Sequence, residues 1–441
     1  MPLPDTIEAR ISAACPDDTR IVLQTAWARD LSGIKPLLDK PGRASSRDPN
    51  TGETAIHAAI RSCGPAASSN NLNNNNDDEG EEELTLDAAI EAEAAEVVYE
   101  LFVWGGIWND VDADNATAAC LADRLGRTRL YDLCVEAGVR AELLFGLMGG
   151  YEELESDEDE QSKDTEEDEN EEAPELVDSA AIPAPVDDTT MTDPPVTSKR
   201  YLESTLVLDN DKLVDADLNG VMMAWEKPIM ERTVSLLIPP PASPASPGPR
   251  ILNVGFGMGI IDTLFAGTCP SRHHIIEAHP AVLARLSAPS NPSFGPMWES
   301  SGPDADAFKV HSGRWQDIVP SLLESGELYD AVYFDTFGED YAQLRAFFTE
   351  CLPGLLAPHG RFGYFNGCGA DRRVCYDVYA RVAEAHLAEA GLDVDWTDVH
   401  VGQLGEEHEG EWEGVRRRYW TLESELSSAL LGGVCVCVCS C

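Results

Sequence analysis

The stretch Arg250-Ile-Leu-Asn-Val-Gly-Phe-Gly-Met-Gly-Ile-Ile261 decides the fold class of this chain. It begins as an apolar run typical of a buried strand, passes through a turn with three glycines, and becomes apolar again where a helix would start. Gly255, Gly257 and Gly259 allow the backbone to turn sharply and to lie close to a ligand. Their spacing differs from the Gly-x-Gly-x-x-Gly of dinucleotide sites, so the turn alone predicts either a nucleotide-type site or a bare structural turn.

Three further predicted strands follow, and each brings a side chain suited to a nucleoside to its carboxyl end. The first ends in Glu277, whose carboxylate can accept hydrogen bonds from both ribose hydroxyls. The second precedes Trp315, whose flat face suits stacking of an adenine, and the third delivers Asp335. Together they predict a nucleoside cofactor. The absence of the phosphate-type turn favours S-adenosylmethionine over NAD.

Composition divides the chain into two folded blocks. In residues 196–423, apolar β-type runs alternate with helical stretches, which predicts an α/β domain built on a parallel sheet. Residues 1–148 are predicted to be mainly helical, because apolar positions recur at helical spacing in Ile21–Leu38, Leu86–Trp104 and Ala118–Leu147.

Three other segments have the composition of unstructured chain. Residues 149–195 are acidic and then rich in Pro, Thr and Asp, which predicts a disordered linker. Residues 68–83, an Asn tract followed by acids, are predicted to be a disordered insertion. The Cys-rich tail, 424–441, is predicted to be disordered and dispensable. Its alternate cysteines could ligate a soft metal, but they lack zinc-site spacing, so no metal site is predicted.

The helical block contains two copies of a repeat-like pattern. Asp48–Ala59 resembles the turn and first helix of an ankyrin repeat, and Trp108–Ala122 is a weaker copy. Thr54 and Thr117 lie 63 residues apart, close to two periods of about 33. We therefore predict an ankyrin-like docking or stabilising domain without chemistry of its own, in which His57 bonds the turn rather than a ligand.

The charge of the chain restricts its partners. The 441 residues suggest two or three units, and 79 Asp and Glu against 31 Lys and Arg give a net charge of −48. Residues 152–178 alone hold sixteen acids and one lysine. Neutralising phosphates needs a basic face, so nucleic acid is excluded as the main partner, whereas a negative field suits a basic protein substrate.

Cysteine usage and apolar runs predict an intracellular protein. Eight of the twelve cysteines are scattered singly, and Met1-Pro-Leu-Pro-Asp5 has neither the basic nor the apolar region of a secretory signal. No apolar run approaches the ~20 residues that a membrane helix needs. We therefore expect reduced thiols and no membrane partner.

The stretch Val221-Met-Met-Ala-Trp-Glu-Lys-Pro-Ile-Met230 precedes the first strand of the predicted sheet. It is predicted to be a methionine-rich helix, which is most often adaptable core. Alternatively, Trp225 and Glu226 could cap the cofactor pocket with an aromatic wall and a carboxylate.

On these residues the chain resembles the protein arginine N-methyltransferase 2 family, the type IV enzymes that methylate the internal δ nitrogen of arginine. More distantly, it resembles guanidinoacetate N-methyltransferase. The matching motifs are Val221-Met-Met-Ala-Trp-Glu226, Asn253-Val-Gly-Phe-Gly-Met-Gly259, Ile276-Glu-Ala-His279, Gly313-Arg-Trp-Gln-Asp317, Phe334-Asp-Thr336 and Tyr364-Phe-Asn-Gly367. The resemblance implies a Rossmann-like class I S-adenosylmethionine-dependent methyltransferase domain preceded by the ankyrin-like domain.

The resemblance also implies the site residues. Glu226 and Asp335 match the carboxylates that hold the guanidinium in the guanidino enzyme. The cofactor would be contacted by Tyr201, Met222, Met230, Phe256, Gly257, Met258, Gly259, Ile260, Ile261, Glu277, Ala278, His279, Trp315, Gln316 and Asp335. Two positions depart from related enzymes: Asn253 stands where many methyltransferases have an acid, and Gln316 replaces the acid of the guanidinoacetate enzyme.

The function implied by the resemblance is monomethylation of the internal guanidino nitrogen of arginine in a basic, ribosomal protein. The enzyme is expected to be a monomer of cytoplasm and nucleus, with no direct nucleic-acid partner. Two alternatives stay open. One is a small-molecule guanidino methyltransferase, and the other is an ankyrin scaffold with an inactive methyltransferase fold.

Overall fold

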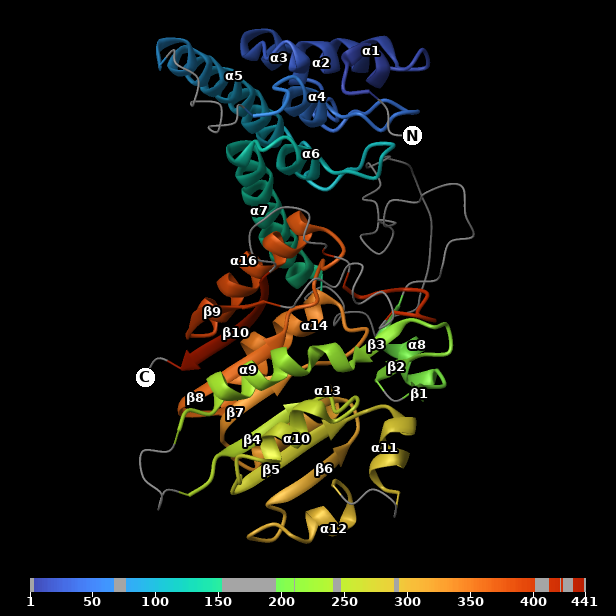
Figure 1. Ribbon diagram of the computed structural model, residues 1–441, viewed down its shortest axis with the longest axis vertical. Coiled ribbons are helices and arrows are strands. Elements are labelled where there is room, and N and C mark those ends of the chain that lie inside the picture. The colour runs from blue at the N-terminus through green and yellow to red at the C-terminus, as the bar shows by residue number, and fades with distance from the viewer. Residues whose placement is uncertain are drawn as a thin grey trace, which may run out of the picture. The chain divides into compact units, whose positions relative to one another are not determined.

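The computed structural model describes residues 4–66, 77–152, 196–209, 211–240, 247–288, 293–400, 412–420, 422 and 431–439 (Figure 1). The chain forms two compact units that divide between Pro194 and Pro195. This division matches the predicted separation of a helical block from an α/β block.

The first unit is helical in its described residues. Its helices are α1 (Ile7–Arg10), α2 (Asp17–Trp27), α3 (Leu31–Leu38), α4 (Ala55–Arg61), α5 (Asp77–Val103), α6 (Ala118–Arg124) and α7 (Thr128–Glu152). Two predicted runs are each divided into two helices. Arg29, at φ 55°, separates α2 from α3, and Gly126, at φ 71°, separates α6 from α7, because left-handed backbone cannot continue a helix.

Helices α4 and α6 begin in the same way. Thr54 caps the first and Thr117 the second, and each threonine forms an isolated bridge with the loop before it. His57 is structural, as predicted: its Nδ1 lies 2.8 Å from the Thr54 hydroxyl, and its Nε2 donates to the Ala116 carbonyl at 3.0 Å. The imidazole therefore links the two copies. The ankyrin-like identity of the unit stays a prediction.

A buried ionic cluster ties the start of the first unit to both copies. Arg10 and Arg61 donate to Asp112 at 3.1 and 2.9 Å, and Arg61 also pairs with Glu53 at 3.2 Å. The four side chains are almost fully buried. Because an unpaired charge is costly in such a place, the cluster stabilises one arrangement of α1, α4 and the loop before α6.

The second unit is an α/β fold. Its strands are β1 (Val207–Asp209), β2 (Lys212–Val214), β3 (Gly220–Met223), β4 (Arg250–Val254), β5 (Arg272–Glu277), β6 (Phe308–Ser312), β7 (Tyr329–Phe334), β8 (Leu356–Phe365), β9 (Leu392–His400) and β10 (Leu431–Cys439). Its helices are α8 (Ser198–Glu203), η3 (Ala224–Glu226), α9 (Lys227–Leu237), α10 (Ile260–Ala266), α11 (Pro280–Leu286), α12 (Pro296–Glu299), α13 (Trp315–Glu324), α14 (Tyr341–Ala346), η4 (Phe347–Cys351), α15 (Leu352–Leu355) and α16 (Arg373–Glu389).

The strands of the described residues form two sheets. Strands β1, β2 and β3 make a small antiparallel sheet, and the other seven lie in the order β6-β5-β4-β7-β8-β10-β9. Strands β4 to β8 are parallel and follow the doubly wound order 3-2-1-4-5, which confirms the predicted Rossmann-like class. The order reverses between β4 and β7, where such sheets bind ligands beyond the carboxyl ends of their strands.

Alternation along the strands builds a core on each face of the large sheet. Ile251 of β4, Ile275 of β5 and Tyr333 of β7 face α9, α10 and α11. Leu252 and Val254 of β4 face the opposite layer, which contains α13, α14, α15 and α16 (Figure 1). Both faces are covered, so β4 and β7 carry buried apolar side chains on both sides.

The predicted disorder of the tail is wrong, because residues 431–439 form strand β10. β10 lies between β8 and β9 and is antiparallel to both, with Cys435 opposite Tyr364 on one side and Trp396 on the other. Its sequence alternates valine with cysteine, a period that fits a strand. The tail is therefore an interior strand of the sheet.

Two other boundaries differ from the predictions. Residues 77–83 of the predicted insertion belong to α5, and residues 149–152 of the predicted linker belong to α7. The remainder of both predicted segments, 68–76 and 153–195, lies outside the described residues.

The predicted methionine-rich helix is wrong over its first three residues. Val221–Met223 belongs to β3 and pairs with β2. The short 3₁₀ helix η3 follows at Ala224–Glu226, and the α-helix α9 begins at Lys227, with Pro228 in its first turn, where proline is well tolerated.

Within the described residues, no helix combines the length and apolarity needed to cross a membrane. The eight cysteines whose side chains are described are free thiols, and no cluster of metal-ligating side chains occurs in the same part of the chain.

Truncation after residue 430 tests the role of β10. Removing this strand leaves the facing edges of β8 and β9 unpaired, so we expect insoluble protein or a melting temperature lower by about 10 °C or more. For a domain of this size, a loss of 1 kcal/mol of stability lowers the melting temperature by ~2–4 °C. Removal of Ser440 and Cys441 alone is the control and leaves β10 intact. An unchanged melting curve after truncation at 430 would return the tail to the dispensable extension that its composition predicts.

Candidate active site

The glycine turn after β4 comes into close contact with two other elements. At Gly255, with φ 98°, a Cβ would lie 1.9 Å from the main-chain oxygen of Asp335, beyond β7. At Gly257 a Cβ would lie 2.8 Å from the Met222 methyl group, on β3. The backbone of Asp335 therefore excludes a side chain at Gly255, whereas at Gly257 the flexible end of Met222 would have to move. The turn lies directly against the segments that carry the predicted carboxylates.

A buried network of hydrogen-bonded side chains stabilises the turn. The Asn253 amide donates to the Gly255 carbonyl at 2.9 Å and to Asp262 at 2.7 Å, and Asp262 lies 2.9 Å from His273 Nε2. All three side chains are fully buried. This explains why an amide serves at position 253: the neighbouring acid, Asp262, supplies the negative charge, and the amide can donate to both partners.

Glu277 lies on the other side of the turn, at the end of β5. Its carboxylate accepts from the backbone N–H groups of Phe256 at 2.9 Å and His279 at 2.6 Å, with a longer contact of 3.4 Å to Gly257. Burial raises the pKa of Glu277, and these N–H donors oppose that rise. The carboxylate is thus fixed against the turn, with acceptor capacity left for a ligand.

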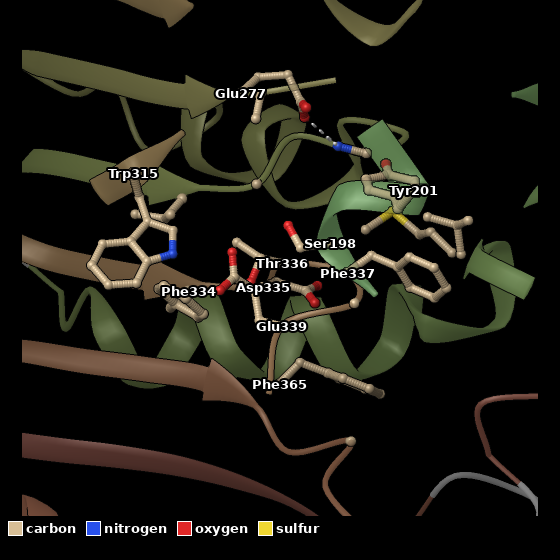
Figure 2. Close-up of a pocket in the computed structure, with 18 of the residues that line it drawn as sticks. Ser198, Tyr201, Glu277, Trp315, Phe334, Asp335, Thr336, Phe337, Glu339 and Phe365 are labelled. Atoms are coloured by element: carbon tan, nitrogen blue, oxygen red, sulfur yellow. Dashed lines mark hydrogen bonds between the residues drawn. The ribbon is translucent and has the colours of Figure 1, made fainter. Parts of the chain in front are cut away.

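One cavity opens beside the turn at the carboxyl ends of the parallel strands (Figure 2). Its lining includes Ser198, Tyr201, Leu202, Val221, Met222, Glu226, Gly255, Gly257, Glu277, Ala278, Arg314, Trp315, Phe334, Asp335, Thr336, Phe337, Glu339, Asp340, Phe365, Gly367, Cys368 and Tyr419. Figure 2 shows Trp315 and Tyr201 at opposite ends of the cavity, with Asp335 between them. The site therefore lies where the sheet topology predicts a ligand.

The structure brings many of the predicted site residues to this cavity. Those that line it are Glu226, Asp335, Tyr201, Met222, Gly257, Glu277, Ala278 and Trp315. The others are absent from its lining. Phe256, Ile261 and Met230 are buried core residues, Gly259, Met258 and Ile260 form the end of the turn and the start of α10, and His279 caps α11.

Gln316 also stays outside the lining. Its amide lies within hydrogen-bond distance of Gln343 and Glu339. Glu339 does line the cavity, and burial raises the pKa of its carboxyl group. An acid is therefore present on this side of the site, although it comes from the segment after β7.

One part of the cavity lining, at Tyr419, was not predicted from the sequence. Tyr419 lines the cavity and belongs to residues 412–420, a segment that shows neither strand nor helix periodicity. Phe337 lies two residues beyond Asp335, at the predicted end of a strand, and Phe365 lies in the motif Tyr364-Phe-Asn-Gly367, so these positions were the signal available. Trp225, expected as an aromatic wall, is instead buried behind Tyr419, with ring centroids 6.1 Å apart.

Two carboxylates with raised pKa values line the cavity. Glu226 is 2% exposed, and burial together with the negative charge of Asp335 raises its pKa well above the ordinary range. The pKa of Asp335 is also raised, chiefly by removal from water. A cation placed between them would relieve both effects, because it neutralises the like charges.

The whole cavity favours a cation. Five carboxylates line it, those of Glu226, Glu277, Asp335, Glu339 and Asp340, and Arg314 is the sole basic side chain in the described lining. A sulfonium group and a guanidinium group are both cations that such a cavity can hold. The chemistry of the lining therefore fits both S-adenosylmethionine and an arginine side chain.

Comparison with known proteins gives consistent relatives. A family model described as guanidinoacetate N-methyltransferase matches residues 209–369. The chain is 56% identical to protein arginine N-methyltransferase 2 of Gibberella zeae, over 96% of this chain and 94% of that protein. For the protein of the same name from Neurospora crassa the identity is 51%, with 95% and 97% covered.

More distant relatives extend the match. The Saccharomyces cerevisiae protein named protein arginine N-methyltransferase 2 is 35% identical, with 87% of this chain and 84% of that protein covered. Among solved structures, an S-adenosylmethionine-dependent methyltransferase of Mesorhizobium loti is 14% identical. The match covers 49% of this chain and 98% of that chain, with a TM-score of 0.28.

Gly255→Ala tests the close approach of the turn to β7. The new methyl group would meet the Asp335 main-chain oxygen, so we expect misfolded protein or a loss of several kcal/mol of stability. Gly326→Ala is the matched control, because Gly326 also has a positive φ of 70° but has open space around it, and it should lose only about 1 kcal/mol. Equal urea unfolding midpoints for the two variants would contradict the geometry.

Glu226→Gln tests the repulsion between the carboxylates without measuring activity. The raised pKa means that folding becomes less favourable as pH rises from the unfolded value near 4.3 through the folded one. The variant should therefore be more stable than the parent by about 1–3 kcal/mol at pH 8, and by less at pH 5. Glu231→Gln, at an exposed position, is the control and should leave the melting curves at pH 8 and pH 5 unchanged. A Glu226→Gln protein that is destabilised at both pH values would refute the idea.

Proposed function

The chain belongs to the protein arginine N-methyltransferase 2 family, and on this basis we propose that it methylates an arginine side chain of a protein. The observation that carries the proposal is the pair Glu226 and Asp335, two carboxylates with raised pKa values in one cavity. A guanidinium is a planar cation with N–H donors on each side, and it matches such a pair by charge and by hydrogen bonding.

The cofactor is S-adenosyl-L-methionine, which supplies the methyl group when bound. Glu277 would accept hydrogen bonds from the ribose hydroxyls, and Trp315 would contact the adenine. The backbone of the turn at Gly257, Met222 and Tyr201 would surround the methionine end. These assignments use residues that line the cavity.

The carboxylates act on the substrate nitrogen. A guanidinium is a poor nucleophile, because its pKa is above 12 and its lone pairs are delocalised. Hydrogen bonds from its two terminal amino groups to Glu226 and Asp335 would orient the plane and draw positive charge toward those groups. The internal nitrogen then keeps more lone-pair character, and one carboxylate accepts its proton as the new bond forms. Holding the nucleophile in place can contribute ~7–11 kcal/mol.

The finer features of the reaction come from the resemblance. The methyl group goes to the internal δ nitrogen, once per arginine, in a basic ribosomal protein, with the monomeric enzyme acting in cytoplasm and nucleus. The net charge of −48 supports a basic substrate, because an acidic surface raises the encounter rate with cations. The helical, ankyrin-like unit would then dock the protein substrate.

A second candidate is methylation of a small guanidino compound. The match of residues 209–369 to the guanidinoacetate N-methyltransferase family favours it. The helical first unit weighs against it, because a small substrate needs no docking domain.

Mass spectrometry distinguishes the two candidates. The pure enzyme is incubated with methyl-labelled S-adenosylmethionine and either a basic ribosomal protein extract or guanidinoacetate. We expect labelled protein whose fragments place one methyl group on the internal nitrogen. Turnover of guanidinoacetate without protein labelling would establish the small-molecule activity, and inactivity toward both with S-adenosylhomocysteine still bound would indicate an inactive fold.

Glu226→Gln and Asp335→Asn test the two carboxylates in that assay. Each should lower kcat by about 100-fold or more, because each removes an ionic contact and a proton acceptor. Asp330→Asn, at the amino end of the same strand as Asp335 and paired with Arg250, should stay within about threefold. The assignment fails if both cavity variants retain turnover near that of the control.

A further inference from the structure

We infer that Tyr419 is a positioning residue for Glu226: its hydroxyl holds one carboxylate oxygen so that the other faces the guanidinium. The inference rests on the proposed function of the cavity. It assigns a role to the wall that comes from residues 412–420, 193 positions along the chain from Glu226.

The hydrogen bonds of Glu226 all converge on one of its oxygens. Oε1 accepts from the Met223 backbone N–H at 2.8 Å and from the Tyr419 hydroxyl, a short contact. Among the described residues, none donates a hydrogen bond to Oε2. The carboxylate is therefore held by one edge, and its other edge is left for a ligand in the cavity that both residues line.

The backbone of the Tyr419 segment is attached to the strand that leads to Glu226. Gly220 N–H donates to the Arg417 carbonyl at 3.0 Å, and Arg416 N–H donates to the Leu218 carbonyl at 2.8 Å. Gly220 begins β3, which runs directly into the helical turn η3 that carries Glu226. Donor and acceptor are thus fixed to the same short strand.

The ring of Tyr419 is held by other aromatic side chains. It stacks on Trp225, with ring centroids 6.1 Å apart. It also makes edge contacts with Trp412 and Phe365, with ring centroids 5.3 Å and 6.3 Å apart. Removing the hydroxyl alone leaves these contacts in place, so Tyr419→Phe tests the hydrogen bond rather than the packing.

The hydroxyl also opposes the electrostatic effects on Glu226. Burial and the negative charge of Asp335 favour the protonated form, while the donors Tyr419 and Met223 N–H favour the ionised one. Asp335 has a longer tyrosine contact: Tyr333, two residues before it in β7, donates to its carboxylate at 3.5 Å. Glu226 therefore depends more on its tyrosine than Asp335 does. Loss of the Tyr419 hydroxyl should raise the pKa of Glu226 further.

The test compares Tyr419→Phe with Tyr329→Phe in the full-length protein. Tyr329 is a matched control, because its buried hydroxyl also makes a hydrogen bond, 2.7 Å from His274 Nδ1, but it is absent from the cavity lining. We expect Tyr419→Phe to lower kcat about 10- to 100-fold with a much smaller change in KM, and Tyr329→Phe to stay within about threefold. Melting curves establish that both variants are folded.

Two readouts separate positioning from a structural role. The deficit of Tyr419→Phe should be larger at pH 6.5 than at pH 9, because the ionised form of Glu226 is reached only at higher pH in the variant. In a Glu226→Gln background the Tyr419→Phe effect should nearly vanish, since the two residues act as a unit. A deficit that is independent of pH and fully additive with Glu226→Gln would overturn the inference.

A failure of the proposed function can be distinguished from a failure of this inference. If the wild-type protein methylates no arginine, the proposed function fails. The inference is then tested by the pH dependence of methylguanidine binding to the S-adenosylhomocysteine complex. Weaker methylguanidine binding by Tyr419→Phe, recovering at high pH, supports the inference. Identical titrations for Tyr419→Phe and the parent protein overturn it.

Discussion

The structure of the second unit is organised around two carboxylates that line one cavity. Burial raises the pKa of both Glu226 and Asp335, and the negative charge of Asp335 raises the pKa of Glu226 further. Such an arrangement costs stability, and proteins keep it where binding removes the cost. The other features of the site follow from this constraint: the turn at Gly255 lies against Asp335, and backbone and hydroxyl donors hold Glu226.

Four segments that are distant in sequence build the site, and the large sheet fixes two of them. Asp335 follows β7, and the glycine turn follows β4, the adjacent strand, so the order of the parallel strands brings them together. Glu226 and Tyr419 come from outside the large sheet and are joined through the hydrogen bonds between β3 and residues 412–420. Completion of the sheet by β10 stabilises the layer on which these segments rest.

The part of the site that could be predicted is the part that follows strands. A buried strand is recognisable by its apolar run, and an acid at its carboxyl end, such as Glu277 or Asp335, points to a ligand. Tyr419 could not be found in this way, because its segment has no periodicity and its contact with Glu226 depends on tertiary packing. The prediction for the tail was wrong for a related reason: alternation of valine and cysteine in residues 431–439 fits a strand, but its partners lie 31 or more residues away in sequence.

Proton release on binding tests the central claim most directly. An arginine-containing peptide is titrated into the complex of the enzyme with S-adenosylhomocysteine near pH 7, in buffers of different ionisation enthalpy, and a citrulline peptide is the control. If two carboxylates with raised pKa values close on a guanidinium, binding lowers those pKa values and net protons are released. The citrulline peptide should release none. Arginine binding without proton release would contradict the account.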